Sequence, residues 1–127
     1  MEAGVNGVIV FLGGGIGAAL RYWMTGSVYR VLGTTFPYGT LLVNVMGSVL
    51  IGFCMGFFEE RFVVQPALRL FLTIGVLGGF TTFSTFSYET IALLQEGSWW
   101  FGTLNIIGSV LTCLAGCWIG GVLGRTV

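Results

Sequence analysis

The sequence predicts an all-α membrane protein with four transmembrane helices. Of its 127 residues, 55% are hydrophobic and only 8% are charged, whereas a soluble domain carries roughly 25% charged residues. The few charged side chains leave long uncharged stretches between them, and about 20 apolar residues are enough to cross a bilayer. Short segments with turn-forming residues separate these stretches.

We predict a single domain over residues 1–127 with spans at approximately 5–24, 39–58, 68–94 and 99–124. The loops between them are short, so consecutive spans run antiparallel. The N-terminus, the second loop and the C-terminus are therefore expected on one side of the membrane, and the first and third loops on the other.

The first span contains a glycine-rich run from Gly13 to Ala18 and ends near Arg21. The run matches a dinucleotide-binding loop in form, but such a loop needs a preceding strand and an acidic residue about 20 positions later. No acidic residue lies between Glu2 and Glu59, which argues against that interpretation. Arg21 is either an interfacial anchor or part of a vestibule that attracts anions.

The second span carries one amide side chain, Asn44. A primary amide in lipid without partners is costly, so we expect Asn44 to face protein or water. Its NH₂ group can donate two hydrogen bonds, including bonds to an anion.

The third span has the most unusual composition of the four. Gly78 and Gly79 precede a dense set of hydroxyls and phenylalanines in residues 80–87. A continuous helix tolerates hydroxyls by bonding them to its own carbonyls, but the glycine pair favours a helix broken near its middle. Exposed backbone inside a membrane is tolerated where it lines a cavity or binds an ion. We therefore expect an ion site at this break.

Two phenylalanines follow the predicted break, Phe83 and Phe86, and their spacing places them on one helix face. Such a pair is usually core packing, but in a pore the positive ring edges can face an anion. Ser84 and Thr85 supply hydroxyl donors beside them.

A weakly polar stripe runs along the fourth span, where Asn105, Ser109 and Cys113 recur every four residues. The stripe is explained equally by hydrogen bonds between helices and by pore lining.

The 22 glycines and the arginines bear on assembly. Many glycines recur four residues apart, as in Gly13 with Gly17 and Gly52 with Gly56, and this spacing lets helices pack closely in lipid.

Three arginines fall on one predicted side and two on the other, so the usual cytoplasmic excess of positive charge is nearly absent. Either a small chain has few charges to distribute, or it inserts in both orientations and pairs head to tail.

Several function classes are disfavoured. The chain has no histidine or lysine and no acid at the middle of a predicted span, which weakens a proton-coupled transporter and an intramembrane enzyme. Its three cysteines and lack of histidine argue against a zinc site, and it has no basic patch for nucleic acid.

Three segments together resemble the Fluc (CrcB) fluoride channel family. They are the glycine-rich residues 13–22 ending in Arg21 and Tyr22, residues 39–47 around Asn44, and the Gly-Gly-x-Thr-Thr-Phe-Ser-Thr-Phe-Ser motif of residues 78–87. The third segment is the most specific, and the resemblance extends over nearly the whole chain.

The resemblance implies an antiparallel, dual-topology homodimer in a bacterial inner membrane that exports fluoride passively and has two anion pores. It also implies a structural sodium ion at the dimer centre, held by the backbone carbonyls of Gly78 and Thr81. The fluoride path implied by the family contains amide, aromatic and hydroxyl side chains: Asn44, Phe83, Phe86, Ser84, Thr85, Ser109 and Thr40. Arg21 and Glu89 match positions at the vestibule, and Cys113 stands where relatives often have threonine.

Two other functions are weighed against a channel. A small dual-topology, proton-coupled multidrug-type exporter shares the size and the weak charge bias, but it is expected to carry a glutamate in its first helix, which this chain lacks. A structural or assembly subunit explains the glycines and leaves the hydroxyl and phenylalanine cluster of the third span unexplained.

Overall fold

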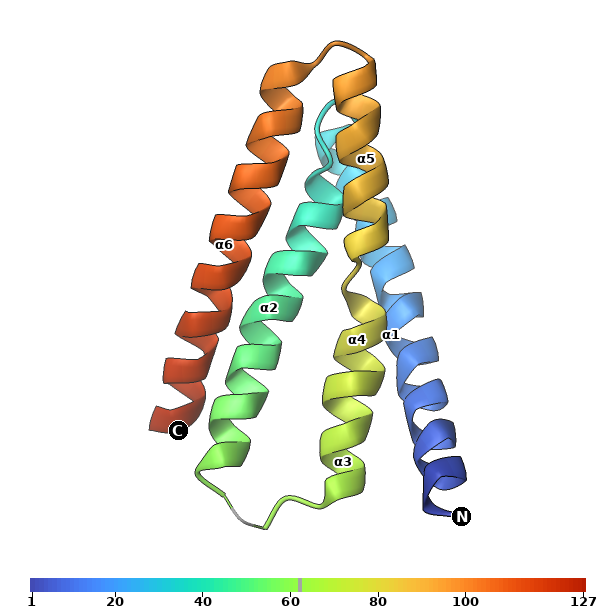
Figure 1. Cartoon of the computed structure of the whole chain (residues 1–127), viewed down its shortest axis with the longest axis vertical. Coiled ribbons are helices and arrows are strands. Elements are labelled where there is room, and N and C mark those ends of the chain that lie inside the picture. The colour runs from blue at the N-terminus through green and yellow to red at the C-terminus, as the bar shows by residue number, and fades with distance from the viewer. Residues whose placement is uncertain (62) are drawn as a thin grey trace.

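The computed structural model describes residues 1–61 and 63–127 and shows four long helical rods, packed side by side and alternating in direction (Figure 1). The rods are α1 (Glu2–Leu32), α2 (Tyr38–Glu59), an interrupted third rod over Pro66–Gln95, and α6 (Trp99–Thr126). Each is long and apolar enough to cross a membrane. The prediction of an all-helical chain with four such helices is confirmed.

Both chain ends and the α2–α3 connection lie at one end of the bundle, and the other two connections lie at the opposite end (Figure 1). This is the arrangement that the short loops predict. At the end with the termini, Arg125 pairs with Glu59 at 3.3 Å, and both side chains are about half exposed. The pair joins the last turns of α2 and α6, which are the two most closely packed helices.

The third rod consists of four helical pieces and one extended step. The helix α3 (Pro66–Leu70) leads into the π-helical segment η1 (Phe71–Leu77), then α4 (Gly78–Phe80), and α5 (Phe83–Gln95) follows the break. Thr81 and Thr82 have extended backbone, with φ and ψ of −88° and 159° and of −152° and 118°. The predicted break is therefore present: it falls at these two threonines, and the glycine pair before them stays helical. The π-helical segment was not predicted.

Within the glycine pair, Gly79 serves helix packing, whereas Gly78 is exposed. A β-carbon at Gly79 would overlap the carbonyl oxygen of Gly14, and one at Gly75 would lie 3.0 Å from the Cα atom of Gly13. At Gly17 a β-carbon would overlap the carbonyl of Val76. The small residues of α1 and the third rod thus let their backbones touch, as glycines spaced four apart do in lipid.

Helices α2 and α6 pack in the same way. A β-carbon at Gly52 or Gly56 would overlap carbonyl oxygens of α6, and one at Gly120 or Gly124 would overlap carbonyl oxygens of α2. The prediction that the spaced glycines serve close packing is confirmed at both interfaces.

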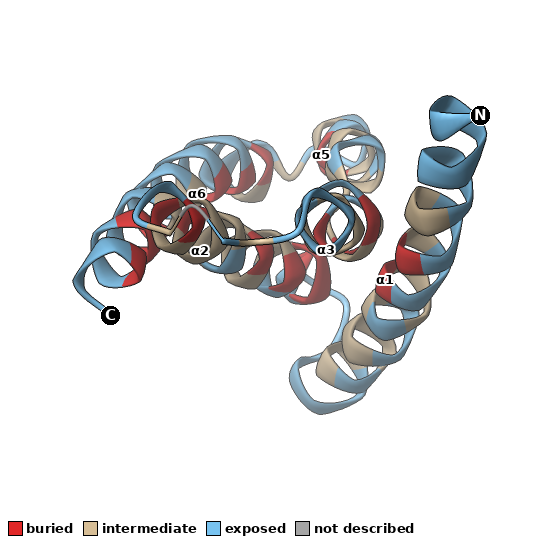
Figure 2. Cartoon of the chain, turned by 90° about the horizontal axis from the view of Figure 1, so that it is seen from below, coloured by how far each residue is buried: buried red, intermediate tan, exposed pale blue. Residues whose placement is uncertain are grey.

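Helix α1 extends beyond the predicted limit near residue 24 and ends at Leu32, where Gly33 follows with a φ of 79°. Arg21 consequently lies inside the helix and not at its end. Viewed along the bundle, α1 lies to one side of the other rods, and its buried residues face the third rod (Figure 2).

Candidate functional site

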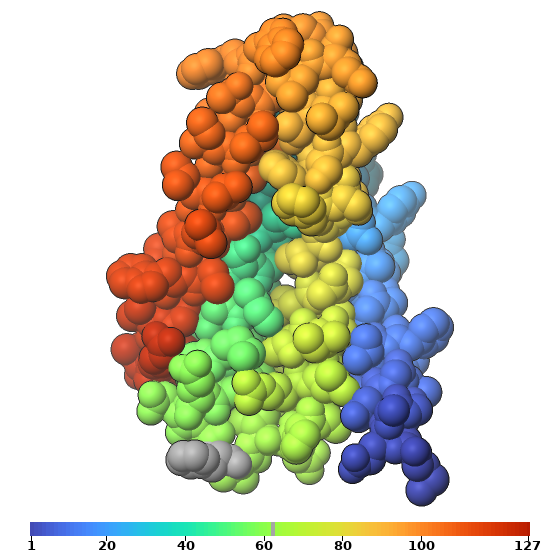
Figure 3. Space-filling model, in the orientation of Figure 1, coloured from blue at the N-terminus to red at the C-terminus, as the bar shows by residue number. Residues whose placement is uncertain are grey.

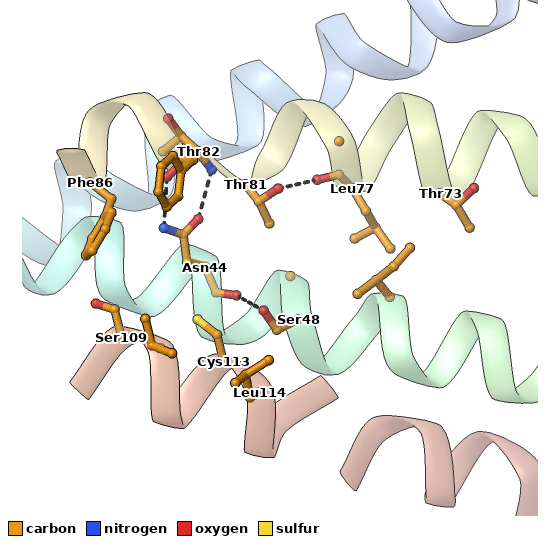
Figure 4. Close-up of a pocket in the computed structure, with 15 residues that line it drawn as sticks. Asn44, Ser48, Thr73, Leu77, Thr81, Thr82, Phe86, Ser109, Cys113 and Leu114 are labelled. Atoms are coloured by element: carbon orange, nitrogen blue, oxygen red, sulfur yellow. Dashed lines mark hydrogen bonds between the residues drawn. The ribbon is translucent and has the colours of Figure 1, made fainter. Parts of the chain in front are cut away.

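Asn44 clamps the break in the third rod. Its Nδ2 donates to the carbonyl of Thr82 at 2.9 Å, and its Oδ1 accepts from the Thr82 N–H at 2.8 Å (Figure 4). Both polar groups of this extended residue are thereby satisfied by one amide on α2. Asn44 faces protein, as predicted, and one N–H of its NH₂ group remains to donate elsewhere.

The two helix ends at the break are capped by neighbouring side chains. The Thr82 hydroxyl accepts from the N–H of Thr85 at 3.2 Å and so acts as the N-cap of α5. On the other side of the break, the Nε of Arg21 donates to the carbonyl of Gly79 at 3.1 Å. A guanidinium at the carbonyl end of a helix also complements its negative dipole.

The carbonyls of Gly78 and Thr81 have lost the donors that a continuous helix would give them. The N–H four residues after Gly78 belongs to Thr82 and donates to Asn44. The N–H four residues after Thr81 belongs to Thr85 and donates to the Thr82 hydroxyl. Freed carbonyl oxygens are suitable ligands for a hard cation such as sodium. Among the described residues there is no cluster of acidic, histidine or cysteine side chains that could hold a metal ion instead.

A cavity of about 450 Å³ lies beside the break, between α2, the third rod and α6. The space-filling view shows an opening between α2 and the third rod at this height (Figure 3). The polar and aromatic residues that line the cavity are Asn44, Ser48, Thr73, Thr81, Thr82, Phe83, Phe86, Ser109 and Cys113. The lining residues include no charged side chain, so an ion in this cavity would meet neutral groups.

Phe83 and Phe86 lie together at this cavity, with ring centroids 5.4 Å apart and an interplanar angle of 42°. Phe83 is 77% exposed, so it is not core packing within the single chain, and Phe86 is half-buried. Of the two interpretations that the sequence leaves open for this pair, the packing of one chain favours cavity lining.

A second cavity of about 340 Å³ lies between α1, the start of α2 and α5. Arg21, Thr40, Thr85 and Glu89 line it, and so does Thr82, which also borders the first cavity. Residues predicted for the vestibule (Arg21, Glu89) and for the fluoride path (Thr40, Thr85) therefore line the same cavity. Thr82 lines both cavities.

Glu89 has two hydroxyl partners in the second cavity. The Tyr29 hydroxyl donates to its Oε2 at 2.9 Å, and the Thr40 hydroxyl donates to its Oε1. The hydroxyl oxygens of Tyr29 and Thr40 are also 3.2 Å apart. These contacts tie α1, α2 and α5 together at one depth.

Three residues predicted for the path lie away from the first cavity, and one of them, Thr85, lines the second. Thr40 lies in the second cavity with Glu89. Ser84 is exposed and lines neither of these two cavities; its hydroxyl lies 3.3 Å from that of Thr82.

The polar stripe of α6 makes an interhelical hydrogen bond and also borders the first cavity. Asn105 is buried and donates to Thr90 of α5 at 2.9 Å, which is an interhelical bond. Ser109 and Cys113 line the first cavity. Cys54, Cys113 and Cys117 are free thiols.

Three residues with structural roles at the site were not singled out from the sequence: Thr82, Tyr29 and Thr90. Threonine is a favoured N-cap residue, so Thr82, just before the second half of the third span, could have been recognised as an N-cap. Nothing local marks Tyr29 or Thr90, because their partners come from other helices.

The sequence model of the family described as CrcB-like protein, Camphor Resistance (CrcB), matches residues 8–121. That match covers most of the chain. The chain belongs to the CrcB family.

Several curated proteins are similar to this chain over almost its whole length. A protein of Citrifermentans bemidjiense is 47% identical over 120 residues, which cover 94% of this chain and 97% of that protein. A protein of Magnetococcus marinus is 48% identical over 118 residues, covering 93% and 96% of the two chains. One of Geobacter sulfurreducens is 49% identical over 112 residues, covering 88% and 90%. Each bears the name fluoride-specific ion channel FluC.

Proposed function

We propose that this protein is a fluoride-specific ion channel. The observation that carries the proposal is the clamped helix break, with Asn44, Phe83, Phe86 and Ser109 on one uncharged cavity beside it. Membership of the CrcB family and the names of relatives that match almost the whole chain support the same function. Those relatives are named as channels and not as enzymes.

The proposed mechanism replaces the water around fluoride with neutral donors. Fluoride enters through the second cavity, where the Arg21 guanidinium attracts it, and passes Thr82 to reach the first cavity. There the free N–H of Asn44, the hydroxyl of Ser109 and the ring edges of Phe83 and Phe86 receive it. Neutral donors bind the ion without the trap that a fixed cation would create, and conduction requires binding that is escapable.

The working unit in this proposal is an antiparallel homodimer with dual topology, which the nearly even arginine distribution supports. A structural sodium ion is proposed at the dimer centre on the Gly78 and Thr81 carbonyls. Gly78 is exposed on the single chain, so its carbonyl is accessible to an ion shared with a partner. The proposed physiological role is passive export of cytoplasmic fluoride across a bacterial inner membrane.

Fluoride efflux from liposomes tests this function. Vesicles containing the purified protein should lose fluoride far faster than empty vesicles and should retain chloride. Fluoride loss at the rate of empty vesicles would reject the channel.

A further inference from the structure

A chain of three hydrogen bonds runs between α5 and α6 behind the first cavity. Ser109 Oγ lies 3.2 Å from Asn105 Oδ1, Asn105 Nδ2 lies 2.9 Å from Thr90 Oγ1, and Thr90 Oγ1 lies 2.7 Å from the carbonyl oxygen of Phe86. Asn105, Thr90 and Ser109 are all buried, and Asn105 is only 2% exposed. Only Ser109 of these three lines the cavity.

The direction of every bond in this chain is fixed from its far end. A carbonyl oxygen only accepts, so the Thr90 hydroxyl must donate its one proton to Phe86. Thr90 can then only accept from Asn105, which turns the NH₂ group of Asn105 toward Thr90. The amide oxygen consequently faces Ser109, and Ser109 must be the donor in that bond.

Ser109 therefore presents lone pairs, and not a proton, to the cavity in this arrangement. In Figure 4 its hydroxyl points away from Cys113. An anion that takes a hydrogen bond from Ser109 has to draw that proton away from Asn105. Asn105 is then left with a buried oxygen that has lost its donor, which is unfavourable.

We propose that Asn105, oriented by Thr90, is a positioning residue that weakens the binding of the permeating anion at Ser109. The inference rests on the proposed function, because it concerns the same ion and the same cavity. Asn105 does not contact the ion. It determines the free-energy cost of turning the Ser109 hydroxyl toward the ion. Such a cost keeps the ion escapable, as conduction requires.

The test is a substitution that releases the amide without changing the cavity wall. In Thr90→Val the side chain keeps nearly the same shape and loses the hydroxyl that orients Asn105. The amide can then turn its NH₂ group toward Ser109, so that Ser109 accepts from it and offers its own proton to the anion. The half-saturating fluoride concentration for efflux should fall on the order of fivefold, the factor that one neutral hydrogen bond is worth.

Thr90→Ser is the matched control. It keeps the hydroxyl and its bond to Phe86, so its half-saturating fluoride concentration should equal that of the unchanged protein. Asn105→Leu removes the acceptor itself and should shift the concentration in the same direction as Thr90→Val. In a Ser109→Ala background, Thr90→Val should produce no shift, because the hydroxyl that it frees is gone.

The outcomes separate the two proposals. If the unchanged protein carries no fluoride, the proposed function fails. The positioning role is wrong if the unchanged protein carries fluoride while Thr90→Val and Asn105→Leu show the same half-saturating fluoride concentration as that protein. An equal shift in Thr90→Ser and Thr90→Val would also overturn it, since a general packing defect would then be the cause.

Discussion

At the scale of single residues, Asn44 performs two tasks with one amide. It holds both polar groups of Thr82 and still borders the cavity. An asparagine fits here because it carries a donor and an acceptor side by side, which match the N–H and C=O of one extended residue. No hydroxyl or carboxylate offers both groups at this separation.

Replacing Asn44 with leucine should therefore destabilise the extended backbone at the break. The change removes two hydrogen bonds and leaves the N–H and C=O of Thr82 without partners, at a cost of about 2 to 4 kcal/mol. We expect fluoride efflux to be lost and the melting temperature in detergent to fall. Ser48→Ala is the control, because Ser48 lines the same cavity but bonds only to the carbonyl of Asn44 in its own helix. Equal effects of the two substitutions would contradict the clamp.

Phe83 and Phe86 are expected to act on the ion and not on folding. Phe83→Ile and Phe86→Ile should each reduce fluoride efflux strongly, because an aliphatic side chain has no positive ring edge. Elution of the purified protein in size-exclusion chromatography should not change. Phe11→Ile provides the comparison, since Phe11 of α1 is as exposed as Phe83, at 77% for each, and lines neither cavity of the site. Unchanged efflux in both motif variants would remove the two rings from the path.

At the scale of helices, the backbone contacts made by glycine decide how the elements pack. Gly17 allows α1 to touch the third rod at Val76 and Phe80, whereas Gly15, half a turn away on the same helix, has no heavy atom within 4 Å of the position of a β-carbon. The spacing rule for small residues could identify such helices in advance. It could not say which glycine of a run faces the neighbour.

Gly17→Ala should separate α1 from the third rod. Its methyl group meets backbone atoms, including the Phe80 nitrogen at 2.8 Å, which cannot yield as a side chain would. Overpacking of this kind costs about 1 to 3 kcal/mol, and it also moves Arg21 away from Gly79. We expect a lower melting temperature and reduced efflux, while Gly15→Ala should behave like the unchanged protein. A stable and active Gly17→Ala variant would show that the interface is looser than this packing indicates.

For the whole molecule, the proposed dual topology predicts that added positive charge will fix the orientation of insertion. Thr34→Lys with Thr35→Lys adds charge at one end of the bundle, and Val63→Lys with Gln65→Lys adds it at the other; all four positions are exposed. Each double variant should insert in one orientation and be inactive when expressed alone, because it lacks an inverted partner. Co-expression of the two should restore fluoride resistance in cells. Full activity of either variant alone would exclude an obligatory antiparallel pair.

Four apolar helices, their alternating directions and an interruption in the third could be predicted from the amino-acid sequence. Hydrophobic length, short loops and local composition carry this information, because the bilayer fixes how long a span must be and which polar groups it tolerates. Asn44, Phe83, Phe86 and Ser109 could also be selected as candidates, since polar and clustered aromatic residues are unusual in a span.

The exact position of the break and the contacts that hold it depend on the packing of the helices. Gly79 packs against Gly14, and Thr82 is extended because Asn44 of another helix bonds its backbone. Arg21 reaches Gly79 because α1 packs against the third rod through Gly14 and Gly17. The orientation of the Ser109 hydroxyl depends likewise on Thr90 of a different helix. These features arise from contacts between segments far apart in the chain, and local patterns do not encode such contacts.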